Sequence, residues 1–156
     1  MLTINQPAPH FSLYDAHEVL HKLDDYKNHW LVVYFYPKDN TPGCTTEACS
    51  LQDDSAKFAA LHTQIIGIST DSSKSHLNFS QKQRLTFTLL ADPKGEVSKA
   101  YEALFKLGPL KFSKRHSFII DPNGKVAKIY RSVSPSIHSQ ELINDLQQLQ
   151  AEFKNE

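Results

Sequence analysis

The sequence predicts an α/β sandwich built on a mixed β-sheet. Three observations support this class. Several short apolar runs are rich in β-branched and aromatic residues, helical patterns separate them, and the last run turns back as a hairpin before a final helix. This alternation of strands and helices is typical of helices packed on a central sheet. With 156 residues, the chain is expected to form one domain, residues 1–156, with its own core.

Strands are predicted in chain order from these runs. Residues 30–36, 64–69 and 116–121 are nearly continuous apolar segments, as expected for strands buried on both faces. A Pro-Asn-Gly turn at 122–124 precedes residues 126–130, which we expect to pair with the preceding strand as a hairpin. Two weaker signals complete the set: a strand at 86–90, and an N-terminal hairpin of 11–14 with 19–21.

Helices are predicted between the strands. The longest spans residues 45–61 and has one apolar face, formed by Ala48, Leu51, Ser55 and Phe58. A polar helix at 73–84 follows, with Leu77 as its main apolar anchor and Asp71 or Ser72 as its N-cap. A short helix is expected at 94–102. An apolar stripe predicts a helix near the C-terminus, formed by Leu142, Leu146, Leu149 and Phe153.

Composition excludes several classes of function. Seventeen basic and seventeen acidic residues cancel, and no block of like charge suggests a nucleic-acid surface. The longest apolar stretch, 30–36, is too short to span a bilayer. The first residues lack the basic and apolar regions of a secretory signal. We therefore expect a cytoplasmic protein, in which two cysteines are more often reactive or metal-binding than a permanent disulfide.

Residues 37–49 carry the most informative motif, Pro-Lys-Asp-Asn-Thr-Pro-Gly-Cys-Thr-Thr-Glu-Ala-Cys, which contains the only two cysteines, Cys44 and Cys49. Thr41 suits an N-cap and Pro42 suits the first helical position, so Cys44 should lie in the first turn of a helix. Backbone N–H groups there lack helical partners, and the helix dipole favours an anion. A thiolate is an anion, so this pattern predicts a reactive cysteine; the alternative is an inert buried one.

The expected fold gives this cysteine further partners. Cys44 would follow the carboxyl end of strand 30–36, where open α/β sheets place their ligands. Arg115 immediately precedes strand 116–121 and could supply a cation beside the thiol. The Thr41 hydroxyl would lie at the same position, and Gly43 would help to shape the turn.

These motifs together resemble those of the peroxiredoxins. The family pattern Pro-x-x-x-Thr-x-x-Cys is matched by Pro37, Thr41 and Cys44. Residues 35–45 resemble the longer signature of the bacterioferritin comigratory protein, or peroxiredoxin Q, branch, whose second cysteine is matched by Cys49. The active-site arginine of the family precedes a Ser-Phe-strand-Asp pattern, matched by residues 115–121. Residues 66–71 and 90–95 are also similar to family segments, so the resemblance spans most of the chain.

The resemblance implies a thioredoxin-like fold, with a central mixed sheet flanked by helices. It also implies a thioredoxin-dependent peroxiredoxin, an antioxidant enzyme that reduces hydrogen peroxide and organic hydroperoxides through cysteine thiols. No cofactor or metal is expected. The reductant would be thioredoxin or a similar dithiol protein, and the chain would act as a monomer or a weak dimer, with no nucleic-acid or membrane partner.

The roles of the polar residues follow from the resemblance. Cys44 would attack the peroxide as a thiolate and become a sulfenic acid. Arg115 would stabilise the thiolate and the charge developing on the departing oxygen. We also expect Glu47 to orient Arg115 through an ion pair.

The rest of the motif would form the substrate site. The Thr41 hydroxyl would hydrogen-bond the thiolate and the peroxide. Backbone N–H groups at the helix start, including those of Gly43 and Cys44, would hold the substrate oxygen. Pro37 would shield the site from water.

Cys49 is predicted to resolve the sulfenic acid by forming a disulfide with Cys44. On an ideal helix, residues five apart have Cα atoms about 8.7 Å apart, whereas a disulfide needs them within about 7 Å. The first turns of the helix would therefore have to unwind. Cys49 points away from the apolar face, so an external reductant could reach it.

Other interpretations compete with this one. A thiol–disulfide oxidoreductase is disfavoured because the chain has no Cys-x-x-Cys. A redox sensor or holdase-like binding protein would use the same oxidation to expose apolar surface. In a further alternative, Cys49 is passive and Cys44 works by a one-cysteine mechanism. The two cysteines, five residues apart, match no zinc knuckle.

Overall fold

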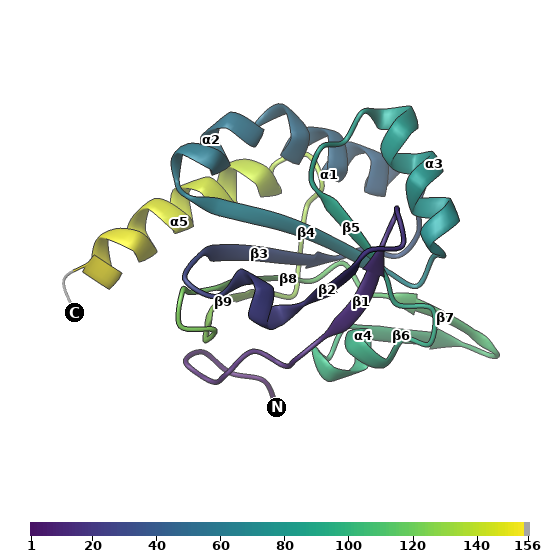
Figure 1. Cartoon of the computed structure of the whole chain (residues 1–156), viewed down its shortest axis with the longest axis horizontal. Coiled ribbons are helices and arrows are strands. Elements are labelled where there is room, and N and C mark those ends of the chain that lie inside the picture. Colours follow the sequence, from purple (N-terminus) through teal and green to yellow (C-terminus); the bar gives the residue numbers. More distant parts are fainter. Residues whose placement is uncertain (155–156) are drawn as a thin grey trace.

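The computed structural model describes residues 1–154 and is built on a seven-stranded mixed sheet (Figure 1). The strand order is β2-β1-β5-β4-β3-β8-β9. The strands of this sheet are β1 (Ser12–Asp15), β2 (Leu20–Lys22), β3 (Trp30–Phe35), β4 (Thr63–Ser69), β5 (Thr88–Ala91), β8 (Ser117–Ile120) and β9 (Val126–Tyr130). The pairs β3–β4 and β4–β5 are parallel, whereas β1–β2, β1–β5, β3–β8 and β8–β9 are antiparallel.

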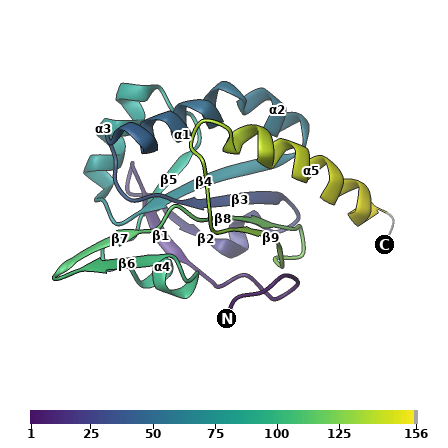
Figure 2. The ribbon, with the colours of Figure 1, turned by 180° about the vertical axis from the view of Figure 1, so that it is seen from behind.

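Helices lie on both faces of the sheet. Figures 1 and 2 show α1, α2, α3 and α5 over one face, and α4 with the small β6–β7 hairpin beyond the other. The helices are the 3₁₀ helix η1 (Leu23–Tyr26), α1 (Pro42–Asp53), α2 (Ser55–Ala60), α3 (Ser73–Gln83), α4 (Glu96–Ala100) and α5 (His138–Lys154). This arrangement confirms the predicted fold class, a central mixed sheet flanked by helices.

Strand β3 is buried along its whole length because it has a packed layer on each face. Its side chains alternate between the two faces. Leu31, Val33 and Phe35 belong to the core shared with α4 and the N-terminal segment. Val32 and Tyr34 belong to the core shared with α1, α3 and α5. The near-continuous apolar run at 30–36 is therefore explained by burial on both sides.

The predicted helix at 45–61 is wrong in one respect, because the structure divides it into α1 and α2. The break lies at Asp54, whose carboxylate accepts a hydrogen bond from the Ser139 hydroxyl of α5 at 2.7 Å. The apolar face continues across the break, since Leu51 and Phe58 are both buried in the same core. Because the apolar pattern continues across Asp54, the sequence did not predict the helix break at that residue.

The anchor of α3 also differs from the prediction. Ser72 is the N-cap, as expected, and its hydroxyl accepts a hydrogen bond from the Ser75 N–H at 3.1 Å. Leu77 is only partly buried, however, and the residues that α3 buries are His76 and Phe79. A buried histidine on a helix of low hydrophobicity requires polar partners inside the fold.

A second small sheet was not predicted. It pairs β6 (Leu104–Leu107) with β7 (Leu110–Ser113) in antiparallel register. Gly108, in the connecting turn, has a φ of 59°, a left-handed conformation that glycine adopts readily. Phe105, Leu107 and Leu110 on this hairpin are exposed.

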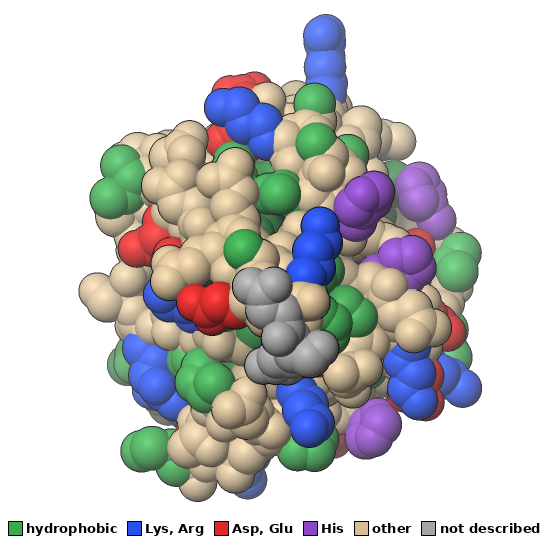
Figure 3. All heavy atoms as spheres, turned by 90° about the vertical axis from the view of Figure 1, so that its left-hand side faces the viewer, with side chains coloured by type: hydrophobic (Ala, Val, Ile, Leu, Met, Phe, Trp, Pro, Cys, Tyr) green, Lys and Arg blue, Asp and Glu red, His purple; other side chains and the backbone are tan. Residues whose placement is uncertain are grey.

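Charged side chains of both signs are scattered over the face seen in Figure 3, with no continuous patch of one sign. This distribution matches the balanced composition. Within residues 1–154, the structure contains no helix that combines the length and the apolar character needed to cross a membrane.

Candidate active site

Three chain segments meet at one edge of the central sheet. Strands β3 and β4 are parallel, so their carboxyl ends lie at the same edge. Strand β8 is antiparallel to β3, which brings its amino end to that edge, and the Phe35 N–H donates to the His116 carbonyl at 2.7 Å. The loop after β3 and the arginine before β8 therefore approach each other, as the sequence predicted from the positions of Cys44 and Arg115.

Helix α1 begins directly after this loop. Thr41 is its N-cap, with extended backbone angles, and Pro42 occupies the first helical position. The first helical hydrogen bond runs from the Thr45 N–H to the Thr41 carbonyl at 2.9 Å. Gly43 and Cys44 therefore lie in the first turn, where N–H groups precede the hydrogen-bonded part of the helix. The Cys44 side chain is only 1% exposed.

The Arg115 guanidinium joins the thiol to a carboxylate. Its Nη2 donates to Cys44 Sγ at 3.4 Å, and its Nη1 donates to Glu47 Oε1 at 2.9 Å. One planar fork thus contacts both groups, an arrangement that a lysine ammonium could not reproduce. The ion pair that the sequence led us to expect between Glu47 and Arg115 is present in the structure.

In the triad of Cys44, Glu47 and Arg115, burial and the neighbouring groups together shift the pKa values of Glu47 and Arg115. Burial raises the pKa of Glu47 to about 7, although the Arg115 charge and hydrogen bond act in the opposite direction. Burial also tends to lower the pKa of Arg115, but the neighbouring Cys44 and Glu47 outweigh it and raise the pKa overall. The guanidinium therefore stays charged, while the Glu47 carboxyl changes its protonation near neutral pH.

Two buried oxygens near the triad have no hydrogen-bond partner among the described residues. They are the Tyr34 hydroxyl and Glu47 Oε2. Burial, together with the charges of Glu47 and Cys44, raises the pKa of Tyr34 well above the ordinary value. Tyr34 therefore remains a neutral hydroxyl in the wall of the site. The aromatic run at 34–36 was expected to contribute to the core and to the wall of a pocket, but the lack of a partner for the Tyr34 hydroxyl was not predicted.

Gly43 lies directly beneath the arginine. A Cβ at this position would come within 3.0 Å of Arg115 Nη2 and 3.8 Å of Pro135 Cγ. The guanidinium thus packs closely on the first turn of α1, and the absence of a side chain at Gly43 permits that approach.

The structure places Thr41 and Pro37 in the loop before the helix, both partly buried. The Thr41 hydroxyl donates to the Lys38 carbonyl at 2.8 Å. This differs from the expected hydrogen bond to the thiolate, because the loop carbonyl accepts the hydroxyl hydrogen instead. The lone pairs of the Thr41 oxygen remain able to accept a hydrogen bond.

Cys49 lies on the same helix but has a different environment. Both cysteines are free thiols. The Cys49 thiol is partly buried and donates to Gln83 Oε1, at the end of α3, at 3.4 Å. Burial and the negative charge of Asp53 raise the pKa of Cys49. Cys49 is therefore a protonated thiol at neutral pH, separated from Cys44 by intact helix.

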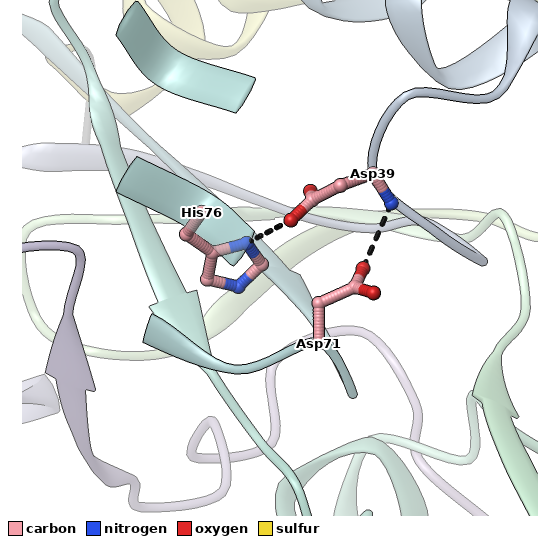
Figure 4. A group of neighbouring side chains, drawn as sticks. All are labelled: Asp39, Asp71 and His76. Carbon is pink, nitrogen blue, oxygen red and sulfur yellow. Dashed lines mark hydrogen bonds and ion pairs between the residues drawn. The ribbon is translucent and has the colours of Figure 1, made fainter. Parts of the chain in front are cut away.

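A polar cluster behind the loop was missed by the sequence reasoning. Asp39, Asp71 and His76 bring one possible ligand atom each to within 4.8 Å of one another (Figure 4). The parallel ends of β3 and β4 explain why Asp39 and Asp71 meet. The sequence did contain one signal for this cluster, because Asp39 and Asp71 each follow a predicted buried strand. Their contact with His76 of α3 depends on tertiary packing and leaves no such signal.

Comparison with known proteins identifies the family. The AhpC/TSA family model matches residues 4–129. Peroxiredoxin Bcp of Bacillus subtilis is 40% identical over 154 residues, which is 95% of this chain and 97% of that protein. The chain belongs to the AhpC/TSA family. A putative peroxiredoxin bcp of Coxiella burnetii is 34% identical, over 93% of this chain and 99% of that protein.

Solved structures agree with this assignment. A crystal structure of a PrxQ mutant from Xylella fastidiosa superposes with a TM-score of 0.88 at 32% identity, covering 94% of this chain and 96% of that one. BcpB of Mycobacterium tuberculosis gives the same TM-score at 28% identity, covering 94% and 97%. The predicted resemblance to the Bcp and peroxiredoxin Q branch and the thioredoxin-like fold are thereby confirmed. As a member of this family, the chain is a thiol-dependent peroxidase, an oxidoreductase.

Proposed function

We propose that Cys44 is the nucleophile of this peroxidase. Its thiolate sulfur attacks the terminal oxygen of the hydroperoxide, the O–O bond breaks, and the other oxygen leaves as water or an alcohol after taking up a proton from solvent. Cys44 becomes a sulfenic acid. The observation that carries this proposal is the 3.4 Å contact between Arg115 Nη2 and Cys44 Sγ at the first turn of α1.

The surrounding groups would bind the peroxide and stabilise the charge that develops on it. Arg115, oriented by Glu47, stabilises the thiolate and the departing oxygen. The Gly43 and Cys44 N–H groups donate to the substrate. The Thr41 oxygen accepts a hydrogen bond from the peroxide hydroxyl while its own hydrogen stays bonded to the Lys38 carbonyl.

Pro37 would limit the access of water to the thiol. Both hydrogen peroxide and organic hydroperoxides are proposed substrates. The solved Xanthomonas campestris bacterioferritin comigratory protein, 32% identical to this chain, is described as having alkyl peroxide reduction activity.

Cys49 would then complete the cycle. Its sulfur attacks the sulfenic sulfur as the Cys49 thiol gives up its proton, the sulfenic hydroxyl leaves with that proton as water, and an intramolecular Cys44–Cys49 disulfide forms. A dithiol reductant, thioredoxin or a similar protein, would reduce that disulfide. We further propose that the whole chain is one peroxiredoxin domain, that it acts in the cytoplasm as a monomer or weak dimer, and that it needs no cofactor.

Two variants test this assignment. Cys44→Ser should abolish peroxide consumption in the presence of thioredoxin. Cys49→Ser should consume about one equivalent of peroxide and then stop as the sulfenic acid, unless a small thiol is added. A Cys49→Ser protein as active as the wild type with thioredoxin would refute the resolving role. A wild type that consumes no peroxide would instead support the redox-sensor interpretation.

A further inference from the structure

His76 is a buried histidine whose two ring nitrogens both face hydrogen-bond acceptors. It lies on α3 and is 0% exposed. Its Nδ1 is 2.7 Å from Asp39 Oδ2, and its Nε2 is 2.9 Å from the Leu90 carbonyl oxygen. Figure 4 shows the imidazole pointing at the Asp39 carboxylate.

These contacts determine how many protons the pair must hold. A carbonyl oxygen only accepts, so Nε2 must carry a hydrogen. If Nδ1 were bare, its lone pair would face a carboxylate lone pair at 2.7 Å. A proton must therefore lie between Nδ1 and Asp39, on one atom or the other.

Further donors around Asp39 locate that proton on the ring. The Tyr36 hydroxyl donates to Asp39 Oδ1 at 2.6 Å, and the Ser75 hydroxyl donates to Oδ2 at 2.8 Å. These donors occupy lone pairs on both carboxylate oxygens, so the hydrogen between Nδ1 and Oδ2 is placed on the ring nitrogen. Burial and the neighbouring Tyr34 and Asp39 raise the pKa of Tyr36, which therefore remains a donor. The geometry corresponds to an imidazolium paired with a carboxylate.

Asp39 is at the same time an anchor of the loop before Cys44. Its backbone N–H donates to Asp71 Oδ2 at 2.8 Å, and the Ser69 hydroxyl holds the same oxygen at 2.6 Å. The next residue, Asn40, has a φ of 64°, a left-handed conformation that is costly without support. The loop is thus attached at Asp39 to β4 and α3, shortly before α1 begins.

We propose that the His76–Asp39 ion pair, here called the loop latch, holds residues 37–43 and the first turn of α1 in the form that reacts with peroxide. His76 is then a positioning residue for Cys44. This inference rests on the proposed function of Cys44. A metal site is disfavoured here because the facing atoms of His76 and Asp39 are already used in hydrogen bonds within the protein.

The loop latch should favour the attack of Cys44 on peroxide and oppose the formation of the Cys44–Cys49 disulfide. Attack on peroxide needs the folded first turn, whereas disulfide formation needs that turn to open. A variant that weakens the loop latch lowers the population of the reactive form, and the rate of the first step falls with that population. The second step should be unchanged or faster. A merely structural role would not produce this opposite effect.

Asp39→Asn removes the negative charge of the His76–Asp39 pair but keeps its hydrogen bonds. The amide nitrogen that this substitution introduces, in place of Oδ2, can donate to a neutral His76 and to Ser75, while the amide oxygen still accepts from Tyr36. All hydrogen bonds are therefore kept without the ion pair. His76→Gln, in contrast, cannot reach both Asp39 and the Leu90 carbonyl.

The first measurement is the ¹⁵N NMR spectrum of the histidine rings in the reduced protein at pH 7. We expect both His76 nitrogens to carry protons in the wild type and only one to do so in Asp39→Asn. A single protonated nitrogen in the wild type would overturn the imidazolium assignment. This measurement does not depend on peroxidase activity, so it tests the loop latch even if the proposed function fails.

The second measurement follows the two steps separately in single-turnover kinetics. In His76→Gln, peroxide attack should fall about tenfold or more, as expected if under roughly a tenth of the molecules keep the loop in place. Disulfide formation should not slow. His138→Gln is the matched control, because His138 is also buried with both ring nitrogens bonded, to Glu141 and Ser117. The control should lose thermal stability but keep both rates within about twofold.

Equal slowing of both steps in a folded His76→Gln protein, or no change in either, would overturn the proposal. If His76→Gln does not fold, Asp39→Asn provides the kinetic test. Because that variant removes the charge and keeps the hydrogen bonds, it should slow peroxide attack relative to the wild type, again without slowing disulfide formation. An unchanged rate of peroxide attack in Asp39→Asn would count against the ion pair. A slowing of disulfide formation by Asp39→Asn would contradict the proposal.

Discussion

Arg115 links Cys44 and Glu47 in the candidate active site. Its separate nitrogens contact Cys44 Sγ and Glu47 Oε1. A lysine keeps the charge but has one ammonium and no fork. Arg115→Lys should therefore reduce the second-order rate constant for peroxide attack by about 10²–10³, the cost of losing one aligned donor. Stopped-flow kinetics measures this, and a rate within a few-fold of the wild type would show that positive charge alone is sufficient.

Glu47 should give the peroxide step a pH dependence. Burial raises its pKa to about 7, so the carboxyl is protonated below that pH and ionised above it. Protonation weakens the ion pair with Arg115, and the rate of peroxide attack should therefore fall as pH decreases through this pKa. Glu47→Gln is nearly isosteric and cannot ionise. It should react more slowly on the alkaline side and should lack the part of the pH profile that Glu47 contributes.

The comparison of the two pH profiles isolates this contribution, since any titration of other groups occurs in both proteins. Coincident profiles, after scaling to their alkaline values, would contradict the role of Glu47. A circular dichroism spectrum at each pH serves as the control for folding.

Local motifs predicted where the candidate site residues lie in the fold better than they predicted the contacts of these residues. The positions of Cys44, Thr41 and Arg115 were predictable because their neighbours in sequence determine where a helix or strand begins. The hydrogen bond of Thr41 to the Lys38 carbonyl was not predictable, because it depends on the path of the loop backbone. His76 was passed over in favour of Leu77, since a polar side chain buried by partners from distant segments leaves no periodic signal.

At the level of secondary structure, α1 both positions Cys44 and opposes the disulfide. Cys44 and Cys49 lie within one intact helix, Pro42–Asp53. An ideal helix separates their Cα atoms by about 8.7 Å, beyond the reach of a disulfide. Disulfide formation should therefore open the first turns and remove the Gln83 hydrogen bond of Cys49.

Hydrogen exchange tests this opening. Amides 43–51 should lose protection when the protein is oxidised, whereas amides of β3 should not change. The disulfide must be confirmed by mass spectrometry in the same sample. Unchanged protection of residues 43–51 with the disulfide present would contradict the requirement for unwinding.

Two features at this level escaped the sequence patterns for different physical reasons. The break at Asp54 was hidden because the apolar face runs on from α1 into α2. The β6–β7 hairpin was missed because most of its apolar side chains are exposed. They do not alternate between a buried and an exposed face. The buried strands were found to within two residues, since burial on both faces leaves a continuous apolar run.

At the scale of the whole molecule, the reactive thiol shares its core with the C-terminal helix. Cys44, Ala48 and Leu51 of α1 belong to the same buried cluster as Leu142 of α5. The packing that supports α1 therefore comes from the far end of the sequence. The contact between Arg115 and Cys44 likewise joins residues 71 positions apart. Such contacts are predictable only once the strand order is known.

Leu142→Ala tests this support. Leu142 is 0% exposed, so the substitution should lower the free energy of unfolding by about 2–5 kcal/mol. Leu149→Ala is the matched control on the same helix, because Leu149 is only partly buried against the cluster and should cost less. Urea denaturation of the reduced proteins measures both. Equal losses would show that α5 does not support the core in the way its burial indicates.

The central claim is that Cys44 reacts with peroxide and Cys49 follows. Its most direct test is mass spectrometry of the reduced wild-type and Cys49→Ser proteins after one equivalent of hydrogen peroxide, with peptide mapping of the oxidised sulfur. The wild type should contain a Cys44–Cys49 disulfide, and Cys49→Ser should contain sulfenic acid at Cys44. Oxidation found first at Cys49, or a Cys44 left reduced in either protein, would contradict the account.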